Sequence, residues 1–220
     1  MQSAVITGAS SGIGKAICEY LQKEYKIYKI SRSDGIDITN ISSIEKLEFL
    51  KDKNIKILVN CAGIGIFKPH EEIKTKDIQK LIDTNLTAPI VLSKLLLRTL
   101  KQNKGYIFNI TSIEALRHSK FSALYTATKA GLRAFSMSLF EEVRKDVKVI
   151  SINPDITKTN FFDELNFCYS DERDSYIEPQ SIVNIIDLAL KTNEIIEDIT
   201  IRPKLVKITK KRNNNANTPK

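Results

Sequence analysis

The sequence predicts an α/β fold, a single doubly wound parallel sheet with helices on both faces. Short runs rich in β-branched residues alternate with segments of helical period, which is the pattern of βαβ units. A glycine-rich turn follows the first run directly, at the end of the strand where a parallel sheet binds ligands. The 220 residues, 42% of them hydrophobic, can bury one sizeable core but are too few for two comfortable domains.

Six strands are predicted from the β-branched runs, over residues 3–7, 26–31, 55–63, 105–112, 147–154 and 198–203. Helical period predicts helices over residues 12–24, 42–52, 75–84, 86–102, 123–145 and 179–192. Pro89 fits near the start of its helix, because the amide hydrogen that it lacks has no helical partner there. Too few residues separate Ser31 from Asp37 for a helix, so we expect a shortened crossover or a loop.

The net charge of +8 is concentrated at the C-terminal end. Residues 202–220 contain seven basic residues and no acidic one, which leaves 27 basic and 26 acidic residues in the rest of the chain. We therefore expect one domain over residues 1–208 and a basic, disordered tail over residues 209–220. This composition favours a solvated terminus over a nucleic-acid or other anionic partner.

Composition also bears on location and on metal binding. No apolar run approaches the roughly 18 residues that cross a bilayer, and no basic and apolar leader precedes the first strand. We expect a cytoplasmic protein with no membrane partner. Cys18, Cys61 and Cys168 are odd in number and widely spread, which predicts reduced thiols. His70 and His118 are isolated, so we expect no metal site.

The segment VITGASSGIGKAI, residues 5–17, predicts a phosphate-binding turn. It does not match the loop of nucleotide triphosphatases, because Ala9 and Ala16 stand where that loop needs its first glycine and its metal-binding hydroxyl. The glycine spacing also differs from Gly-x-Gly-x-x-Gly and reads Thr-Gly-x-x-x-Gly-x-Gly. Gly8, Gly12 and Gly14 would let the backbone approach a pyrophosphate at the positive end of the next helix.

The end of the second predicted strand bears on the type of dinucleotide. An acid there binds a ribose 2′-hydroxyl, whereas a basic residue accommodates a 2′-phosphate. The strand ends in Ser31-Arg32-Ser33, and a guanidinium suits phosphate in charge and geometry. This favours NADP(H), while Asp34 leaves NAD(H) open.

Tyr125 and Lys129 are four residues apart in a predicted helix, so both side chains project from one face. Ser112 lies thirteen residues earlier, at the end of a predicted strand. A nearby ammonium lowers a phenol's pKa from about 10 by roughly 1 to 3 units, which would make Tyr125 a usable general acid or base. Taken alone, such a pair is more often an amphipathic surface contact.

In these motifs the chain resembles the short-chain dehydrogenase/reductase family, in order along nearly its whole length. Residues 7–14 look like the family's cofactor loop, and Asn60-Cys61-Ala62-Gly63 resembles its Asn-Asn-Ala-Gly segment. The resemblance implies a Rossmann-like fold and a catalytic tetrad of Asn85, Ser112, Tyr125 and Lys129. It implies these cofactor-binding residues: Thr7, Gly8, Ser10, Ser11, Gly12, Ile13, Gly14, Ser31, Arg32, Asp37, Ile38, Asn60, Ala62, Gly63, Tyr125, Lys129, Pro154, Ile156 and Thr159.

The implied activity is an NADP(H)-dependent oxidoreductase that transfers hydride between nicotinamide and a small carbonyl or secondary alcohol substrate. Tyr125 would donate the proton, Lys129 would lower the tyrosine pKa and hold the ribose hydroxyls, Ser112 would bind the carbonyl oxygen, and Asn85 would place a water. The alternative is a catalytically silent dinucleotide-binding sensor or scaffold of the same fold. Relatives commonly form homodimers or homotetramers through the two long helices, here over residues 86–102 and 123–145.

Some positions depart from the family's pattern or have an ordinary structural explanation. Asp155 follows Pro154 where the family usually has glycine, so the loop could sit differently over the substrate. Cys61 replaces an asparagine, which predicts a small buried site and no reactive thiol. Residues 161–178 are aromatic-rich and fit either a lid over an apolar substrate or a helix packed on the core. Asp37 alone could be a turn residue.

Overall fold

A six-stranded parallel sheet forms the centre of the computed structural model, which describes residues 1–211. The strands are β1 (Ser3–Thr7), β2 (Lys26–Ile30), β3 (Ile55–Asn60), β4 (Tyr106–Ile110), β5 (Lys148–Pro154) and β7 (Asp198–Ile201). Their spatial order is β2-β1-β3-β4-β5-β7, with every pairing parallel. The predicted doubly wound sheet and its six strands are confirmed.

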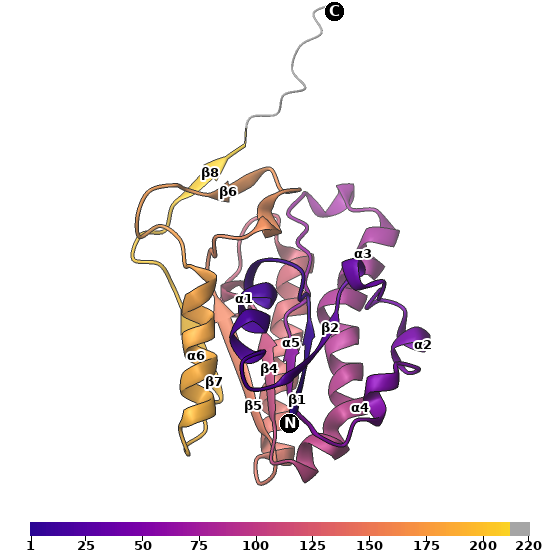
Figure 1. Ribbon diagram of the computed structural model, residues 1–220. Helices are drawn as coiled ribbons and strands as arrows, with labels where there is room; N and C mark the ends of the chain where they lie inside the picture. The colour runs from indigo at the N-terminus through magenta and orange to yellow at the C-terminus, as the bar shows by residue number, and fades with distance from the viewer. Residues whose placement is uncertain (212–220) are drawn as a thin grey trace, which may run out of the picture.

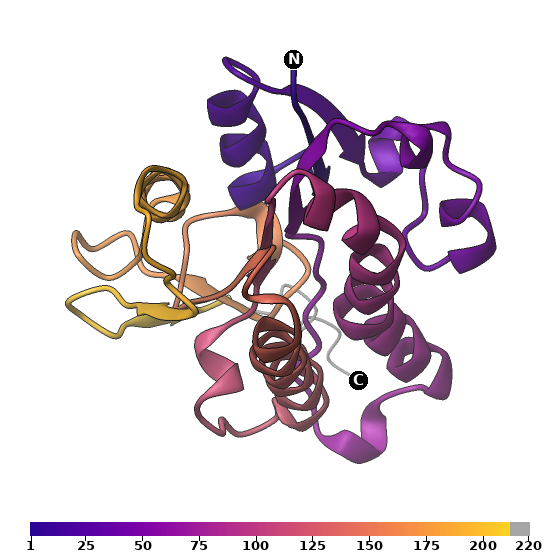
Figure 2. The same ribbon diagram turned by 90° about the horizontal axis from the view of Figure 1, so that it is seen from below.

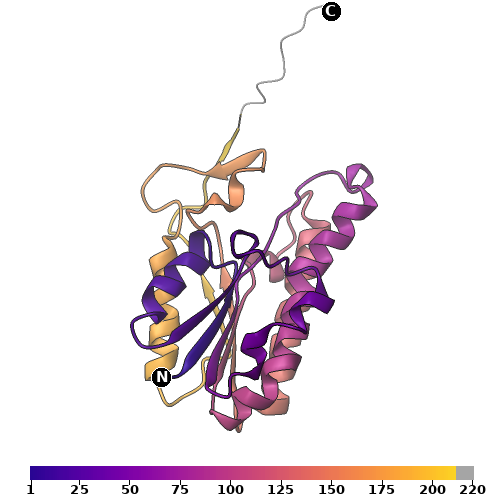
Figure 3. The same cartoon turned by 45° about the vertical axis from the view of Figure 1, so that its right-hand side comes forward.

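Helices cover both faces of the sheet, as Figures 1, 2 and 3 show. One face carries α1 (Gly12–Leu21) and α6 (Pro179–Lys191), and the other carries α4 (Ala88–Gln102) and α5 (Ala123–Val143). On α4 the buried Leu92, Leu96 and Leu100 recur every four residues and form one apolar stripe toward the sheet. Each face therefore has its own hydrophobic core, and the sheet is buried between them.

A π-helical turn, Asp83–Thr87, joins α3 (Thr75–Ile82) to α4. The two helices that the sequence predicts here are thus continuous, with one wide turn between them. Such turns are rare and occur mostly at functional sites. This turn carries the buried Asn85 toward the carboxyl ends of the strands.

The helix predicted over residues 42–52 is wrong. The segment contains a single turn, α2 (Ile41–Ile44), and a separate 3₁₀ turn at Glu48–Lys51. Leu47 between them is extended, and Phe49 stacks on Tyr28 of β2 with ring centroids 5.1 Å apart. Packing against the neighbouring strand therefore overrides the local helical period. The absence of a helix between Ser31 and Asp37 is as predicted, since this part holds one 3₁₀ turn.

Two further strands form a small antiparallel sheet above the carboxyl ends of the main strands (Figures 1 and 3). They are β6 (Phe167–Tyr169) and β8 (Ile208–Lys210), in a register that pairs Phe167 with Lys210. The disordered tail predicted from residue 209 is therefore wrong for its first residues, because β6 supplies a pairing partner from a distant segment. Residues 212–220 of that tail lie outside the described residues. Within residues 1–211, no helix has both the length and the apolar character to cross a membrane.

Candidate active site

The strand order reverses between β1 and β3, which is the point where doubly wound sheets open a ligand crevice. The Thr7 hydroxyl oxygen accepts hydrogen bonds from the N–H groups of Cys61 and Ala62, both at 2.9 Å. Thr7 thus ties the turn after β1 to the segment after β3. The structure brings these two predicted cofactor segments together at the switch point.

The turn between β1 and α1 has the features of an anion site. Gly8 and Gly12 have positive φ angles of 68° and 51°, which are accessible to glycine at little cost. Among the described residues, Ser11 at the start of α1 finds no side-chain capping hydrogen bond, and the first turn of α1 contains no acid. The backbone N–H groups of this helix start are therefore open to a negatively charged group. Ser10 and Ser11 are exposed beside them.

Thr159, from the loop after β5, closes the other side of this turn. A Cβ atom on Gly12 would lie 3.0 Å from the Cβ and Cγ2 atoms of Thr159. Thr159 therefore lies against the glycine turn, and its contact with a cofactor stays a prediction. Pro154 and Ile156, in the same loop region, are buried.

Gly8→Ala is expected to lower the free energy of unfolding by more than Gly35→Ala. Both glycines have positive φ, which costs an L-residue about 1–2 kcal/mol. A Cβ on Gly35 meets nothing within 4 Å, whereas a Cβ on Gly8 would lie 2.9 Å from the Ala62 backbone. Urea unfolding of the three proteins measures the difference. Equal losses would show that contact with Ala62 does not constrain the turn.

After β2, the side chains of Ser31, Ser33 and Asp34 form hydrogen bonds with one another, whereas Arg32 is exposed. The Ser31 hydroxyl lies 2.7 Å from that of Ser33 and donates to the carboxylate of Asp34. Asp34 is therefore directed back toward the strand. Arg32 is exposed, and in the described part of the chain no carboxylate lies within ion-pair distance of it.

Asp37 forms a turn with Thr39. One of its carboxylate oxygens accepts from the Thr39 N–H at 2.9 Å and from the Thr39 hydroxyl at 2.8 Å. These hydrogen bonds lower the pKa of the Asp37 carboxyl. The ordinary turn role thus accounts for its geometry, and a contact with a cofactor stays a prediction. Ile38 beside it is buried in the core.

Asn85 is completely buried, and both the oxygen and the nitrogen of its amide form hydrogen bonds. Its Oδ1 accepts from the Ile64 N–H and its Nδ2 donates to the Ile64 carbonyl oxygen, each at 2.9 Å. A Cβ on Gly63 would lie 3.5 Å from the Asn85 Oδ1 and 3.4 Å from the Lys129 Nζ. The π-helical turn therefore brings Asn85 and Lys129 to the same glycine.

Ser112, Tyr125 and Lys129 meet where β4 ends and α5 begins. The Lys129 Nζ donates to the Ile110 carbonyl oxygen at 2.9 Å and lies 5.9 Å from the centroid of the Tyr125 ring. Ser112 Oγ accepts from the Glu114 N–H at 3.2 Å. Tyr125 is 6% exposed and Lys129 4%. The structure thus brings the predicted tetrad into one buried site, and its catalytic role stays a prediction.

Burial determines the proton affinities of this site. It raises the pKa of Tyr125 above its ordinary value, although the Ser112 hydroxyl acts in the opposite direction. Loss of hydration disfavours the phenolate more than the Ser112 hydroxyl stabilises it. The lowering of the Tyr125 pKa by Lys129 stays a prediction. Burial lowers the pKa of Lys129 to about 8. It raises the pKa of the Cys61 thiol to about 12, so this thiol is protonated at neutral pH.

Aromatic side chains cover Tyr125. Its ring centroid lies 5.1 Å from that of Phe67 and 5.9 Å from that of Phe161, and Phe167 of β6 packs on Phe67 at 5.1 Å. The segment after β5 contains only a 3₁₀ turn at Asn160–Phe162 before β6. The alternative of a helix packed on the core is therefore wrong, and an aromatic cover over the site fits the geometry.

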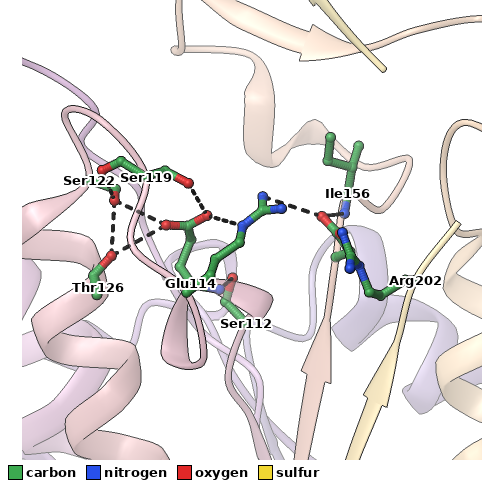
Figure 4. Close-up of polar contacts among 9 residues, drawn as sticks. Ser112, Glu114, Ser119, Ser122, Thr126, Ile156 and Arg202 are labelled. Atoms are coloured by element: carbon green, nitrogen blue, oxygen red, sulfur yellow. Dashed lines mark hydrogen bonds and ion pairs between the residues drawn. The ribbon is translucent and has the colours of Figure 1, made fainter. Parts of the chain in front are cut away.

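Asp155 does not disturb the loop backbone, because its φ angle lies outside the left-handed region. Its side chain is fully buried. One oxygen accepts from the Ile156 N–H at 2.9 Å and the other from Arg202 Nε at 2.9 Å (Figure 4). The departure from the family's glycine thus provides a buried charge, and Arg117 is a second cation beside it. The sequence contains no signal for this pairing, since the partners are far apart along the chain.

Comparison with known proteins identifies the family. The profile of the short chain dehydrogenase family matches residues 35–167. An uncharacterized oxidoreductase of Staphylococcus epidermidis is 32% identical over an alignment that covers 91% of this chain and 96% of the relative. The fold and these matches define a dehydrogenase. The chain belongs to the short-chain dehydrogenase/reductase family, and the predicted resemblance is confirmed.

Solved structures agree with this fold. An alcohol dehydrogenase of the archaeon Thermococcus sibiricus, complexed with 5-hydroxy-NADP, has a TM-score of 0.78 at 24% identity, covering 93% of this chain and 97% of that one. A 4-hydroxyisoleucine dehydrogenase complexed with NADH and succinate has a TM-score of 0.78 at 26% identity, covering 91% and 97%.

Proposed function

We propose that this protein is an NADP(H)-dependent oxidoreductase that transfers hydride between nicotinamide and a carbonyl or secondary alcohol substrate. The observation that carries the proposal is the convergence of Ser112, Tyr125 and Lys129 in one buried site beside a dinucleotide-type glycine turn. A silent sensor of the same fold has no need of a buried proton donor.

The residues present fit a dinucleotide. The uncapped start of α1 suits its pyrophosphate, and the exposed Arg32 suits a 2′-phosphate. The structural relatives are complexed with 5-hydroxy-NADP in one case and NADH in another, so the choice of NADP(H) rests on Arg32 and on the engagement of Asp34 with Ser31. When bound, the nicotinamide supplies or accepts the hydride.

Each side chain then has a distinct role in carbonyl reduction. Ser112 Oγ accepts from the Glu114 N–H, which leaves its own hydrogen to donate to the substrate's carbonyl oxygen. Tyr125 keeps its proton at neutral pH, because its pKa is raised, and it donates this proton to the developing alkoxide. Lys129 would hold the ribose hydroxyls, and Asn85 would place a water for reprotonation. Run backwards, Tyr125 accepts the proton of an alcohol.

The test is to follow nicotinamide absorbance with NADPH and, separately, with NADH over a panel of ketones, aldehydes and acyl-thioester ketones. Turnover of a carbonyl substrate is expected. Cofactor binding without turnover across the panel would favour the sensor alternative.

Arg32→Ala is expected to weaken NADPH binding by about tenfold to a hundredfold and to leave NADH binding unchanged. The reason is that charge-assisted hydrogen bonds contribute about 1.5–3 kcal/mol, and every 1.4 kcal/mol is about tenfold in affinity. Fluorescence titration of both cofactors measures the change. Arg98→Ala, at an exposed position of α4, is the matched control. A wild-type preference for NADH would contradict the assignment to Arg32.

We also propose a homodimer or homotetramer that pairs through α4 and α5. A groove between these helices is lined by Ile90, Leu97, Phe135 and Leu139, with Lys94 and Glu142 also lining it. This mixture of apolar and complementary charged groups fits a copy of the same surface related by two-fold symmetry. A monomeric mass by sedimentation equilibrium would contradict this assembly.

A further inference from the structure

Four charged side chains of alternating sign form a row near Ser112: Glu114, Arg117, Asp155 and Arg202. Figure 4 labels the two ends of this row, Glu114 and Arg202. Arg117 Nε donates to Glu114 Oε1 at 2.8 Å, and Arg117 Nη2 lies 3.7 Å from Asp155 Oδ1. Arg202 Nε donates to the other oxygen of Asp155 at 2.9 Å. Both carboxylates are buried, whereas both guanidinium groups reach solvent. The row connects three separate segments, which follow β4, β5 and β7.

Glu114 contacts both sides of the site. Its backbone N–H donates to Ser112 Oγ at 3.2 Å. Its carboxylate accepts from Ser119 Oγ at 2.7 Å, from Ser122 Oγ at 3.0 Å and from Thr126 Oγ1 at 3.4 Å. Ser122 is the N-cap position of α5, and Thr126 follows Tyr125 in the first turns of that helix.

The Glu114 carboxylate contacts the first turn of α5 through two hydroxyl groups. Ser122 makes no capping hydrogen bond of its own to the N–H groups of α5 in the part of the chain described. Its hydroxyl instead lies 2.7 Å from the Ser119 carbonyl oxygen, 2.9 Å from the Thr126 hydroxyl and 3.0 Å from one carboxylate oxygen of Glu114. The Thr126 hydroxyl lies 3.4 Å from the same Glu114 oxygen. One carboxylate thus contacts the residues on both sides of Tyr125 in this turn, Ser122 and Thr126.

Glu114 is charged at neutral pH. Burial alone would raise its pKa, but the hydrogen bonds from Arg117, Ser119 and Ser122 together hold the pKa of this carboxyl below its ordinary value. Arg117 balances the charge and is itself shared with Asp155. Arg117 therefore lies between the loop after β4, which carries Glu114, and the loop after β5, which carries Asp155.

We propose that Glu114 is a positioning residue, which fixes Ser112 and Tyr125 relative to each other through its backbone and its carboxylate, with Arg117 and Asp155 holding its charge in place. Its consequence for catalysis rests on the proposed function. Hydride and proton transfer require both hydroxyls on the same carbonyl oxygen, and small displacements of such groups reduce rates strongly. If the ion cluster only stabilised the fold, its removal would lower the free energy of unfolding but would not lower kcat at unchanged NADPH affinity.

The test compares Glu114→Gln with Glu141→Gln. The first variant keeps the size of the side chain and removes its charge. The second removes an exposed carboxylate near the other end of α5, where Glu141 lies 3.7 Å from Arg144. For Glu114→Gln we expect kcat to fall about tenfold or more, since a misplaced group alone can cost about a hundredfold, with unchanged NADPH affinity. Amide hydrogen exchange should become faster in residues 112–116 and 122–127 together. Glu141→Gln should change neither kcat nor the amide hydrogen exchange of these segments.

Ser119→Ala is the second variant if Glu114→Gln does not fold. Ser119 is exposed, and its loss leaves the carboxylate charged but removes one donor. A smaller decrease in kcat and faster exchange in the same two segments are expected. Unchanged kcat and unchanged exchange in the folded variants would overturn the proposal. If the wild-type protein turns over no substrate of the panel, the proposed function fails, while hydrogen exchange still decides whether Glu114 couples the two segments.

Discussion

Tyr125→Phe is expected to lower the rate of carbonyl reduction by about 10²- to 10⁴-fold, the range attributed to a positioned general acid. The phenyl ring keeps the packing against Phe67 and Phe161, so the variant loses only the hydroxyl. NADPH affinity should therefore fall much less than the rate, because the ring that packs in the site is kept. Single-turnover kinetics with saturating cofactor isolate the chemical step from binding and product release.

Tyr106→Phe is the matched control for this substitution. Tyr106 begins β4 at the amino end of the sheet, opposite the candidate site, and is half-buried. Removing its hydroxyl should leave turnover as in the wild-type protein. If Tyr125→Phe converted substrate at the wild-type rate, Tyr125 would not be the proton donor, and the proposed mechanism would be wrong.

Lys129→Met is expected to abolish turnover and, at the same time, to change how stability depends on pH. Burial lowers the pKa of Lys129 from 10.5 to about 8. The folded protein therefore binds this proton less tightly than the unfolded chain. Between pH 8 and 10.5 the unfolded state holds more protons at this site, so stability rises with pH there. Burying the charged Lys129 lowers the free energy of unfolding by an amount on the order of 3 kcal/mol, at 1.36 kcal/mol per pKa unit. This loss is fully present below pH 8.

Methionine cannot titrate, so this pH dependence should disappear in the variant. Relative to Lys129→Met, the wild-type protein should gain stability on the order of 3 kcal/mol between pH 7 and pH 10.5. Loss of the hydrogen bond to the Ile110 carbonyl lowers the free energy of unfolding of the variant by the same amount at every pH. It therefore does not change the difference in slope between the two plots of unfolding free energy against pH. Urea unfolding at several pH values measures this, with Lys23→Met at an exposed position as the control. Parallel curves would show that Lys129 is not destabilised by burial.

Local residue patterns were sufficient to predict the six parallel strands, the glycine turn and the spacing of Tyr125 and Lys129. Each of these features is predicted by a pattern within a short segment of the chain, either the period of the apolar side chains or the spacing of the glycines. Local patterns failed for the helix expected over residues 42–52, because Phe49 packs on the ring of Tyr28 in β2. The β6–β8 pair shows the same limit, since each strand has a partner only after the chain has folded.

By itself, the sequence determined the class of the protein and the order of its candidate catalytic residues. Only the tertiary structure decided their environment. The pKa of Tyr125 is raised because the folded chain buries it, with Phe67 and Phe161 packed on its ring, and Glu114 connects Ser112 to α5 because a loop folds back on a helix start. Hydration and long-range charge depend on distances in space, and these distances are not fixed by separations along the chain.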